Sequence, residues 1–169
     1  MEIQKIYFDM DGVLADFDRG VRELADFEPF DQAIRDKKRN DELWDAIRKV
    51  DHFYDKLEMI DGAFEMFIAL KARYRDKCEI LSAIPKPYRG ISTSREDKIS
   101  WVRRLLGTDI KANIVYRAEK QEFAKGPGYI LVDDLAKNIE EWEEAGGTGI
   151  KFENPEDVVR LIEGISLTI

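Results

Sequence analysis

The feature that most constrains the fold is a short apolar run near the start of the chain that ends in two aspartates. Residues 6–8 are the β-branched and aromatic types typical of a strand buried on both faces of a parallel sheet. Asp9 and Asp11 follow at once, and Asp11-Gly12 is a turn signal. Ligands bind at the carboxyl ends of strands in open α/β sheets. Because burying a carboxylate is costly without compensation, this pair predicts a metal site, a phosphate-handling site, or both.

Composition argues against several classes of function. The chain has 169 residues, 44% hydrophobic and 37% charged, which suits one soluble domain with a small insertion. A net charge of −8 without a long basic block disfavours binding to nucleic-acid polymers. No apolar run is long enough for a membrane span, so we expect no membrane partner. The single cysteine, Cys78, cannot form an intramolecular disulfide, and a reducing cytoplasm is the expected compartment.

Strand and helix patterns alternate along residues 61–169. Apolar runs predict strands at 78–81, 110–116, 129–132 and 150–152, with helical periodicity between them. We expect an N-cap at Asp61 and a capping box of Ser94 and Asp97. This alternation predicts an α/β fold, a Rossmann-like parallel sheet with helices on both faces.

Residues 17–60 interrupt that pattern. Apolar residues recur at helical spacing near Phe17 and again near Leu43, and the polar stretch 31–41 separates them. We expect two to four short helices and no strand. The chain therefore divides into an α/β core at 1–16 and 61–169 and a small helical cap at 17–60, inserted after the first strand.

Polar residues follow four of the predicted strands. Asp9 and Asp11 come after the first, Ser82 after the second, Lys120 after the third and Asp133-Asp134 after the fourth. Taken singly, these are ordinary turn or loop residues, a surface lysine and a helix N-cap pair. Together, at the ends of successive strands, they predict a site for a phosphate group.

In this order the motifs resemble the haloacid-dehalogenase (HAD) superfamily of aspartyl-phosphate enzymes, and most closely its 5'(3')-deoxyribonucleotidase branch, which includes phage and bacterial 5'-nucleotidases. The similar stretches cover the core nearly end to end, and the cap matches only loosely. They are DMDGVLADF (9–17), DGAFEMFIALK (61–71), ILSAIPKP (80–87), KISWVRRLLG (98–107) and ILVDDLAKNIEEWEEAGGTGIKF (130–152). The resemblance implies a HAD-type fold and a Mg²⁺-dependent phosphatase that hydrolyses a nucleoside 5'-monophosphate, by preference a deoxyribonucleotide, through an aspartyl-phosphate.

The resemblance also implies a role for each polar residue. Asp9 is the nucleophile, and Asp11 is the general acid and then the general base. Ser82 donates a hydrogen bond to a phosphoryl oxygen, and Lys120 neutralises developing charge.

The same resemblance implies how Mg²⁺ is held. The carboxylates of Asp9 and Asp133 and the backbone carbonyl of Asp11 supply oxygen ligands, together with waters. Asp134 completes the metal site by orienting those waters or the neighbouring lysine.

Two further lysines complicate this assignment. Lys125 is nearer to the acidic pair in sequence than Lys120. However, AEKQEFA (118–124) resembles the phage and bacterial pattern in which the first of the two lysines is the phosphate-site lysine. Lys98 resembles a second lysine that contacts the phosphate and so binds substrate. The alternative is that Lys98 is a surface lysine in the first turn of a helix.

Aromatic residues of the cap are the candidates for binding a base. Phe17 matches the position where relatives place an aromatic ring against the base, and Trp44, Phe53 and Tyr54 are further candidates. Stacking on aromatic rings contributes about 1–3 kcal/mol per base. The alternative is that these rings form the small apolar core of the cap.

Other functions fit parts of the pattern. One is a HAD phosphatase for another small phosphomonoester, and another is a non-catalytic phospho-receiver or binding module. A receiver needs an aspartate at the end of the third strand, where this chain has Tyr116. A binding protein without catalytic activity is expected to lack the nucleophile, whereas Asp9 is present. The base, the sugar and the position of the phosphate are left open, and a homodimer is one assembly that the sequence permits.

Overall fold

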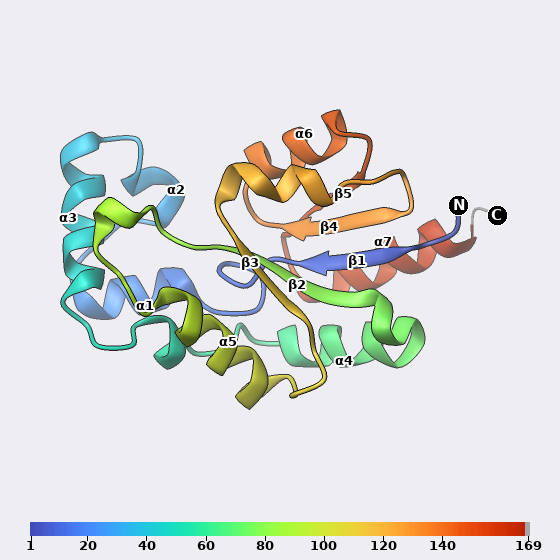
Figure 1. The fold of residues 1–169 in the computed structure, drawn as a ribbon, viewed down its shortest axis with the longest axis horizontal. Coiled ribbons are helices and arrows are strands. Elements are labelled where there is room, and N and C mark those ends of the chain that lie inside the picture. The colour runs from blue at the N-terminus through green and yellow to red at the C-terminus, as the bar shows by residue number, and fades with distance from the viewer. Residues whose placement is uncertain (168–169) are drawn as a thin grey trace.

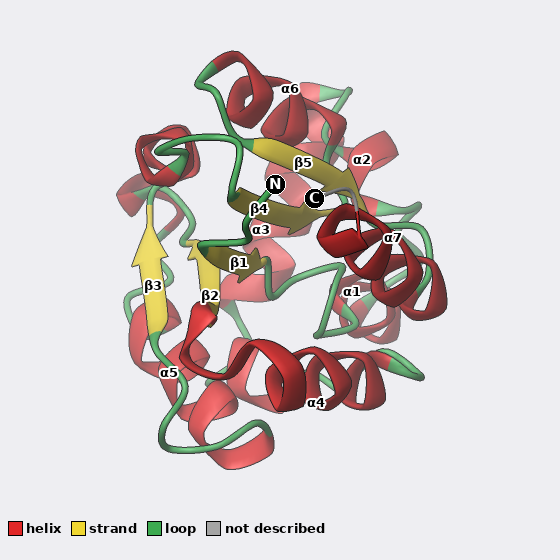
Figure 2. Ribbon diagram, turned by 90° about the vertical axis from the view of Figure 1, so that its right-hand side faces the viewer, coloured by secondary structure: helices red, strands yellow, loops and turns green. Residues whose placement is uncertain are grey.

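The computed structural model, which describes residues 1–167, contains a parallel sheet in the order β3-β2-β1-β4-β5 (Figure 2). The strands are β1 (Lys5–Phe8), β2 (Cys78–Ala83), β3 (Ala112–Val115), β4 (Tyr129–Asp133) and β5 (Thr148–Lys151). Every pair of neighbouring strands is parallel. The predicted parallel sheet is confirmed, and the strand ends differ from the predicted ones by at most two residues.

Helices cover both faces of the sheet because successive strand residues point to opposite faces. Phe8 packs toward α4, with its ring 5.3 Å from that of Phe67. Tyr7, on the other face, packs 5.7 Å from the ring of Trp142 in α6. Figure 2 shows α4, α5 and α7 on one side and α6 on the other. Their bounds are α4 (Ala63–Tyr74), α5 (Ser94–Leu105), α6 (Ala136–Glu144) and α7 (Pro155–Leu167).

The predicted helices between β1 and α4 are also present. Figure 1 shows them beyond the carboxyl ends of β1 and β4. Asp16 and Asp36 cap two of them by accepting hydrogen bonds from backbone N–H groups. Leu43 and Ile47 belong to the same buried cluster as Phe8, so apolar packing is continuous from this segment to the sheet. The helices are α1 (Phe17–Leu24), α2 (Phe30–Ala33) and α3 (Lys37–Arg48).

Four 3-10 segments lie between these elements. They are η1 (Tyr54–Lys56), η2 (Arg75–Lys77), η3 (Pro87–Arg89) and η4 (Arg117–Phe123). Within residues 1–167, no helix combines the length and the apolar character that crossing a bilayer requires.

Two helix starts differ from the sequence-based expectation. The N-cap of α4 is Gly62 at φ 81°, a left-handed conformation that favours glycine, so Asp61 is not the cap. The N-cap of α5 is Thr93, and the capping box of Ser94 and Asp97 is not formed. The Asp97 carboxylate instead accepts a hydrogen bond from Thr93 Oγ1 at 2.7 Å and lies 2.7 Å from Nδ1 of His52. Asp97 therefore links α5 to the chain that leads out of α3.

Candidate active site

A cavity of about 390 Å³ lies between the carboxyl ends of β1 and β4 and the helices α1–α3. Its walls come from the strand ends, from α1–α3, and from the loops that follow β2 and β3. The strand-end residues are Asp9, Asp11, Gly12, Asp134 and Leu135, with Asn138 of α6; the α1–α3 residues are Phe17, Asp18, Phe30, Ile34, Asn40 and Trp44, with Tyr54 of η1; the loops supply residues 83–86, Tyr88, Arg89, Arg117 and Lys120. The cavity thus has an acidic end at the sheet and a largely aromatic end at α1–α3.

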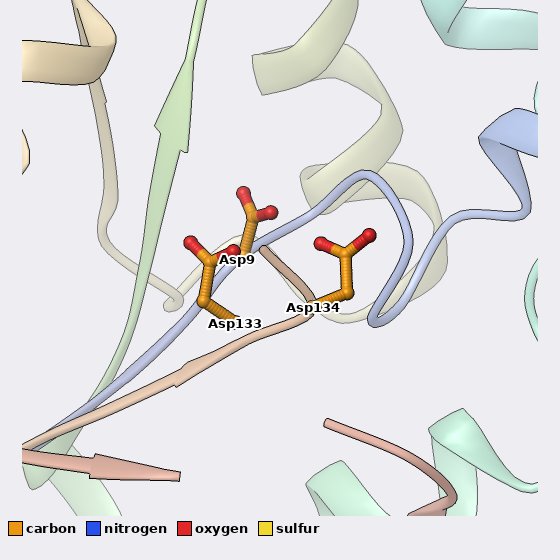
Figure 3. A group of neighbouring side chains, drawn as sticks. All are labelled: Asp9, Asp133 and Asp134. Atoms are coloured by element: carbon orange, nitrogen blue, oxygen red, sulfur yellow. The ribbon is translucent and has the colours of Figure 1, made fainter. Parts of the chain in front are cut away.

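Three aspartates meet at the acidic end (Figure 3). One oxygen from each of Asp9, Asp133 and Asp134 lies within 4.8 Å of the others. Asp9 and Asp133 are buried, and Asp134 is half-buried. A Cβ at Gly12, where φ is +83°, would lie 2.2 Å from Oδ2 of Asp134, so the turn after β1 requires glycine. The predicted meeting of the two acidic motifs is therefore present in the structure.

Lys120 is the lysine that the fold brings to this cluster. It lies on η4, its side chain is buried, and its Nζ is 3.0 Å from Asp9 Oδ1 and 2.7 Å from Asp133 Oδ2. Burial lowers the pKa of Lys120, but the attraction of Asp9 and Asp133 outweighs this and raises it, so the ammonium stays charged. Lys125 is exposed and does not line the cavity.

The acidic cluster carries more negative charge than Lys120 offsets. Burial raises the pKa of Asp9, and Asp133 raises it further while Lys120 opposes the shift. Burial also raises the pKa of Asp134, with added repulsion from Asp9 and Asp133. Such shifts mean that a bound cation would relieve a real electrostatic cost.

The hydrogen bonds of the cluster show which oxygens could hold a metal ion. Asp133 accepts three hydrogen bonds: its Oδ2 accepts from Lys120 at 2.7 Å and from Asn138 at 3.0 Å, and its Oδ1 accepts from Leu135 N–H at 2.9 Å. Asp134 Oδ1 is buried without a partner. An all-oxygen set of this kind fits a hard divalent cation such as Mg²⁺. The oxygen without any partner is on Asp134, and Oδ1 of Asp133 can accept one more contact.

Lys98 lies behind the cavity and ties Asp11 to β2. Its side chain is fully buried, and Nζ donates to Asp11 Oδ2 at 2.7 Å, to Ser82 Oγ at 2.9 Å and to the carbonyl of Ala83 at 2.5 Å. The alternative that Lys98 is a surface lysine is therefore wrong. Three acceptors use its three N–H groups. Neither Lys98 nor Ser82 lines the cavity, so direct contact of either with substrate stays a prediction.

The aromatic end of the cavity is also part of the apolar core. The ring of Phe17 lies 5.2 Å from that of Phe30, 6.3 Å from Trp44 and 6.2 Å from Tyr54. Phe17, Trp44 and Tyr54 line the cavity, whereas Phe53 is buried behind it. The two interpretations of these rings, a cavity wall and a packed core, both hold for Phe17.

Sequence reasoning missed several residues of the cavity wall. Arg117 donates to Asn138 Oδ1 at 3.2 Å and to Glu141 Oε2 at 2.7 Å. Asn138 stands in the first turn of α6, directly after the acidic pair, and this position was the available signal for it. Arg89 donates to Asp41 of α3 at 2.7 Å and so connects the loop after β2 to α3. That contact carries no sequence signal, because the two residues are far apart in the chain.

Comparisons with known proteins agree on a family. A family model described as "5' nucleotidase, deoxy (Pyrimidine), cytosolic type C protein" matches residues 2–164. A protein of Vibrio phage KVP40 (isolate Vibrio parahaemolyticus/Japan/Matsuzaki/1991), named "Putative 5'(3')-deoxyribonucleotidase", is 29% identical over 133 residues, which cover 79% of this chain and 67% of that relative.

Solved structures show the same fold at low sequence identity. A HAD-superfamily hydrolase from Ehrlichia chaffeensis has a TM-score of 0.55 at 15% identity, with 98% of this chain and 99% of that chain covered. A HAD-family enzyme from Bacteroides thetaiotaomicron, solved as a magnesium complex, has a TM-score of 0.51 at 15% identity, with 96% and 99% covered. Because these matches are to nucleotidases and hydrolases, they do not support the phospho-receiver alternative. The chain belongs to the 5' nucleotidase, deoxy (pyrimidine), cytosolic type C family and is a phosphoric monoester hydrolase of the 5'-nucleotidase type on a HAD-like α/β fold.

Proposed function

We propose that this enzyme hydrolyses nucleoside 5'-monophosphates, with a preference for deoxyribonucleotides, in a reaction that depends on Mg²⁺. The observation that carries the proposal is one cavity with two unlike ends, an acidic cluster with Lys120 and a wall of aromatic rings. Its volume of about 390 Å³ lies within the range of sites for small molecules. The family description and the name of the phage relative support a deoxynucleotide as substrate.

The first chemical step uses Asp9 and Asp11. Oδ1 of Asp9 accepts from Met10 N–H at 2.9 Å and pairs with Lys120, which leaves Oδ2 as the oxygen that attacks phosphorus. The P–O bond to the sugar breaks as the Asp9–phosphorus bond forms, and Asp11 gives its proton to the leaving sugar oxygen. Lys98 holds Asp11 in place through Oδ2, and Oδ1, which has no partner, is the oxygen that carries the transferred proton.

The second step returns the enzyme to its starting state. Asp11, now ionised, takes a proton from a water molecule, and that water attacks phosphorus. The bond between phosphorus and Asp9 breaks, inorganic phosphate leaves, and Asp9 is again a carboxylate. Lys120 neutralises charge on the phosphoryl oxygens during both steps. Ser82 donates a hydrogen bond to one of them when its contact with Lys98 is rearranged.

The acidic cluster would hold the metal. We expect Asp9 and Asp134 to supply carboxylate oxygens, since Asp134 Oδ1 has no other partner, with the backbone carbonyl of Asp11 beside them. Oδ1 of Asp133 would add a further carboxylate oxygen, while its Oδ2 holds Lys120 and Asn138. Mg²⁺ bound there would reduce the repulsion between the phosphate and the carboxylates.

The helical segment 17–60 serves as the cap that binds the nucleoside, and residues 1–16 and 61–169 serve as the catalytic core. Phe17 and Trp44 form the wall against which the base packs. We place the enzyme in the cytoplasm, where a nucleotide substrate and the reduced Cys78 are both expected. A homodimer is the assembly to test first by gel filtration with light scattering.

A substrate panel tests this function. The purified enzyme is assayed for phosphate release from deoxy- and ribonucleoside 5'-monophosphates, 3'-monophosphates, 2-deoxyribose 5-phosphate and an aryl phosphate, with Mg²⁺ and with EDTA. We expect the deoxyribonucleoside 5'-monophosphates to give the highest kcat/KM and EDTA to abolish turnover. Asp9→Asn should fold and be inactive. A panel in which 2-deoxyribose 5-phosphate or another small phosphate is preferred would instead identify a different phosphomonoesterase.

A further inference from the structure

One polar atom at the aromatic end of the cavity has no role in the chemistry. Among residues 1–167, the buried side-chain polar atoms without a hydrogen-bond partner are Oδ1 of Asp11, Oδ1 of Asn40 and Oδ1 of Asp134. All three residues line the same cavity. Asp11 and Asp134 lie at the acidic end, where a phosphate and a cation account for them. Asn40 is on α3, which Figure 1 shows well beyond the strand ends.

An unpaired buried acceptor destabilises a protein, so its presence in a cavity wall indicates a ligand that can donate a hydrogen bond to it. The terminal torsion of asparagine is broad, and a rotation about Cβ–Cγ presents the amide to the cavity at little cost. A ligand that donates a hydrogen bond to Asn40 would remove this cost on binding.

Aromatic surface lies next to the amide of Asn40. Trp44 follows Asn40 by four positions in α3, so the two side chains share a helix face, and both line the cavity. The ring of Phe30 lies 6.0 Å from that of Trp44 at an interplanar angle of 87°, and Phe17 is packed against both. A flat apolar group held by these rings would have its edge near Asn40.

Two charged side chains at this end of the cavity, Asp18 and Arg89, are already paired. Asp18 Oδ1 accepts a hydrogen bond from Phe30 N–H at 2.8 Å. Arg89 donates to Asp41 at 2.7 Å, and its guanidinium lies 5.9 Å from the ring of Trp44. Among residues 1–167, Oδ1 of Asn40 is thus the buried side-chain polar atom of α1–α3 without a hydrogen-bond partner.

We propose that Asn40 recognises the base, its amide oxygen accepting a hydrogen bond from a ring or amino N–H on the edge of the base that points away from the sugar. This inference rests on the proposed nucleotidase function and adds to it a residue that determines specificity. Asparagine pairs with base edges through its amide. A site built to make such a bond rejects analogues that lack the donor, because its own buried group is then left unpaired.

The test compares two amide-to-leucine substitutions on three substrates. Asn40→Leu removes the hydrogen bond and keeps the same branched arrangement of side-chain heavy atoms. Gln32→Leu is the matched control, since Gln32 is exposed on α2 and does not line the cavity. The substrates are the deoxyribonucleoside 5'-monophosphate that the wild type prefers, the same nucleotide methylated on the nitrogen donors of its base, and 2-deoxyribose 5-phosphate.

We expect the wild type and Gln32→Leu to prefer the unmodified nucleotide over the methylated one about tenfold or more in kcat/KM, the scale of one hydrogen bond lost from a buried acceptor. Asn40→Leu should lose that preference and should lose more activity on the nucleotide than on 2-deoxyribose 5-phosphate. Asn40→Ala is measured in parallel, so that failure of one variant to fold does not remove the test.

Two results would overturn the proposal, and they differ from failure of the proposed function. If Asn40→Leu and Asn40→Ala discriminate against methylation as the wild type does, the base is recognised elsewhere. If they lose activity equally on all three substrates, Asn40 has only a structural role. If the wild type itself hydrolyses 2-deoxyribose 5-phosphate with the same kcat/KM as the nucleotide, the proposed nucleotidase function is wrong, and the proposed role of Asn40 is then wrong too.

Discussion

Replacing Asp134 by asparagine should stabilise the metal-free protein while it removes activity. Oxygens of Asp9, Asp133 and Asp134 lie within 4.8 Å of one another, and at an effective dielectric constant of about 20 two unit charges at that distance repel by about 3.5 kcal/mol. The ion pairs of Lys120 are with Asp9 and Asp133, so Asp134 is the least compensated of the three. Asparagine has the same shape and keeps the fit against Gly12. We expect Asp134→Asn to raise the free energy of unfolding by roughly 2–4 kcal/mol, or about 5–15 °C in Tm.

The gain in stability from Asp134→Asn should increase as the pH rises. Burial, together with Asp9 and Asp133, raises the pKa of Asp134 above its ordinary value of 3.8 to about 9. A carboxyl group whose pKa is raised on folding destabilises the folded state above its ordinary pKa, and the penalty grows as the pH rises toward the raised value. The advantage of Asp134→Asn should therefore be small near pH 4 and grow toward pH 9.

Thermal and urea unfolding in EDTA at several pH values measure this gain, and a Mg²⁺ titration completes the assay. Mg²⁺ should stabilise the wild type, by about 2.7 kcal/mol at one hundred times its Kd, and should stabilise Asp134→Asn much less. Asp26→Asn, at an exposed position between α1 and α2, is the control for removal of one negative charge. A variant no more stable than the wild type in EDTA would refute the repulsion argument. Equal stabilisation of both proteins by Mg²⁺ would refute Asp134 as a ligand.

Three further predictions concern Lys120, Phe17 and His52. Lys120→Met should lower kcat on an aryl phosphate by about 10²–10³-fold while Lys125→Met stays near wild type, and the opposite order would assign the site to Lys125. Phe17→Ala should lower kcat/KM for nucleotides more than for the aryl phosphate, because about 1–3 kcal/mol of stacking is lost; equal losses would argue against base contact. Hydrogen bonding to Asp97 raises the pKa of His52 above 6.5, so its contribution to stability is present below pH 6.5 and is lost as the pH rises through the raised pKa. The Tm of the wild type should fall over that range more than the Tm of His52→Gln, and parallel Tm profiles would refute this linkage.

The strand ends and the acidic cluster were predictable because both follow from local sequence. The run Ile6 to Phe8 is apolar at every position, so it fits only a strand covered on both faces. Asp9 and Asp133 then lie together because parallel neighbours β1 and β4 end at the same edge. Local sequence also gave the wrong helix cap at Asp61, where a left-handed glycine one residue later takes that position.

The buried lysine and the base-binding candidate were not predictable in the same way. Lys98 follows a polar first turn of α5, and its burial comes from Asp11, 87 positions earlier in the chain. Asn40 lies in the polar stretch 31–41, where composition indicates a solvated surface. Only the packing of α3 over the strand ends makes it part of a cavity wall. In both cases a contact between distant segments changes what a polar residue does.

The balance of charge at the strand ends favours a bound divalent cation. Four carboxylates, those of Asp9, Asp11 and the pair Asp133-Asp134, face two buried lysines, Lys98 and Lys120. When all are ionised the set carries an excess of two negative charges, and both ammonium groups are already bonded to aspartates. An incoming phosphate dianion therefore meets no uncommitted positive charge among these groups. One Mg²⁺ would cancel the excess and allow Lys120 to interact with the phosphate without leaving Asp9 and Asp133 uncompensated.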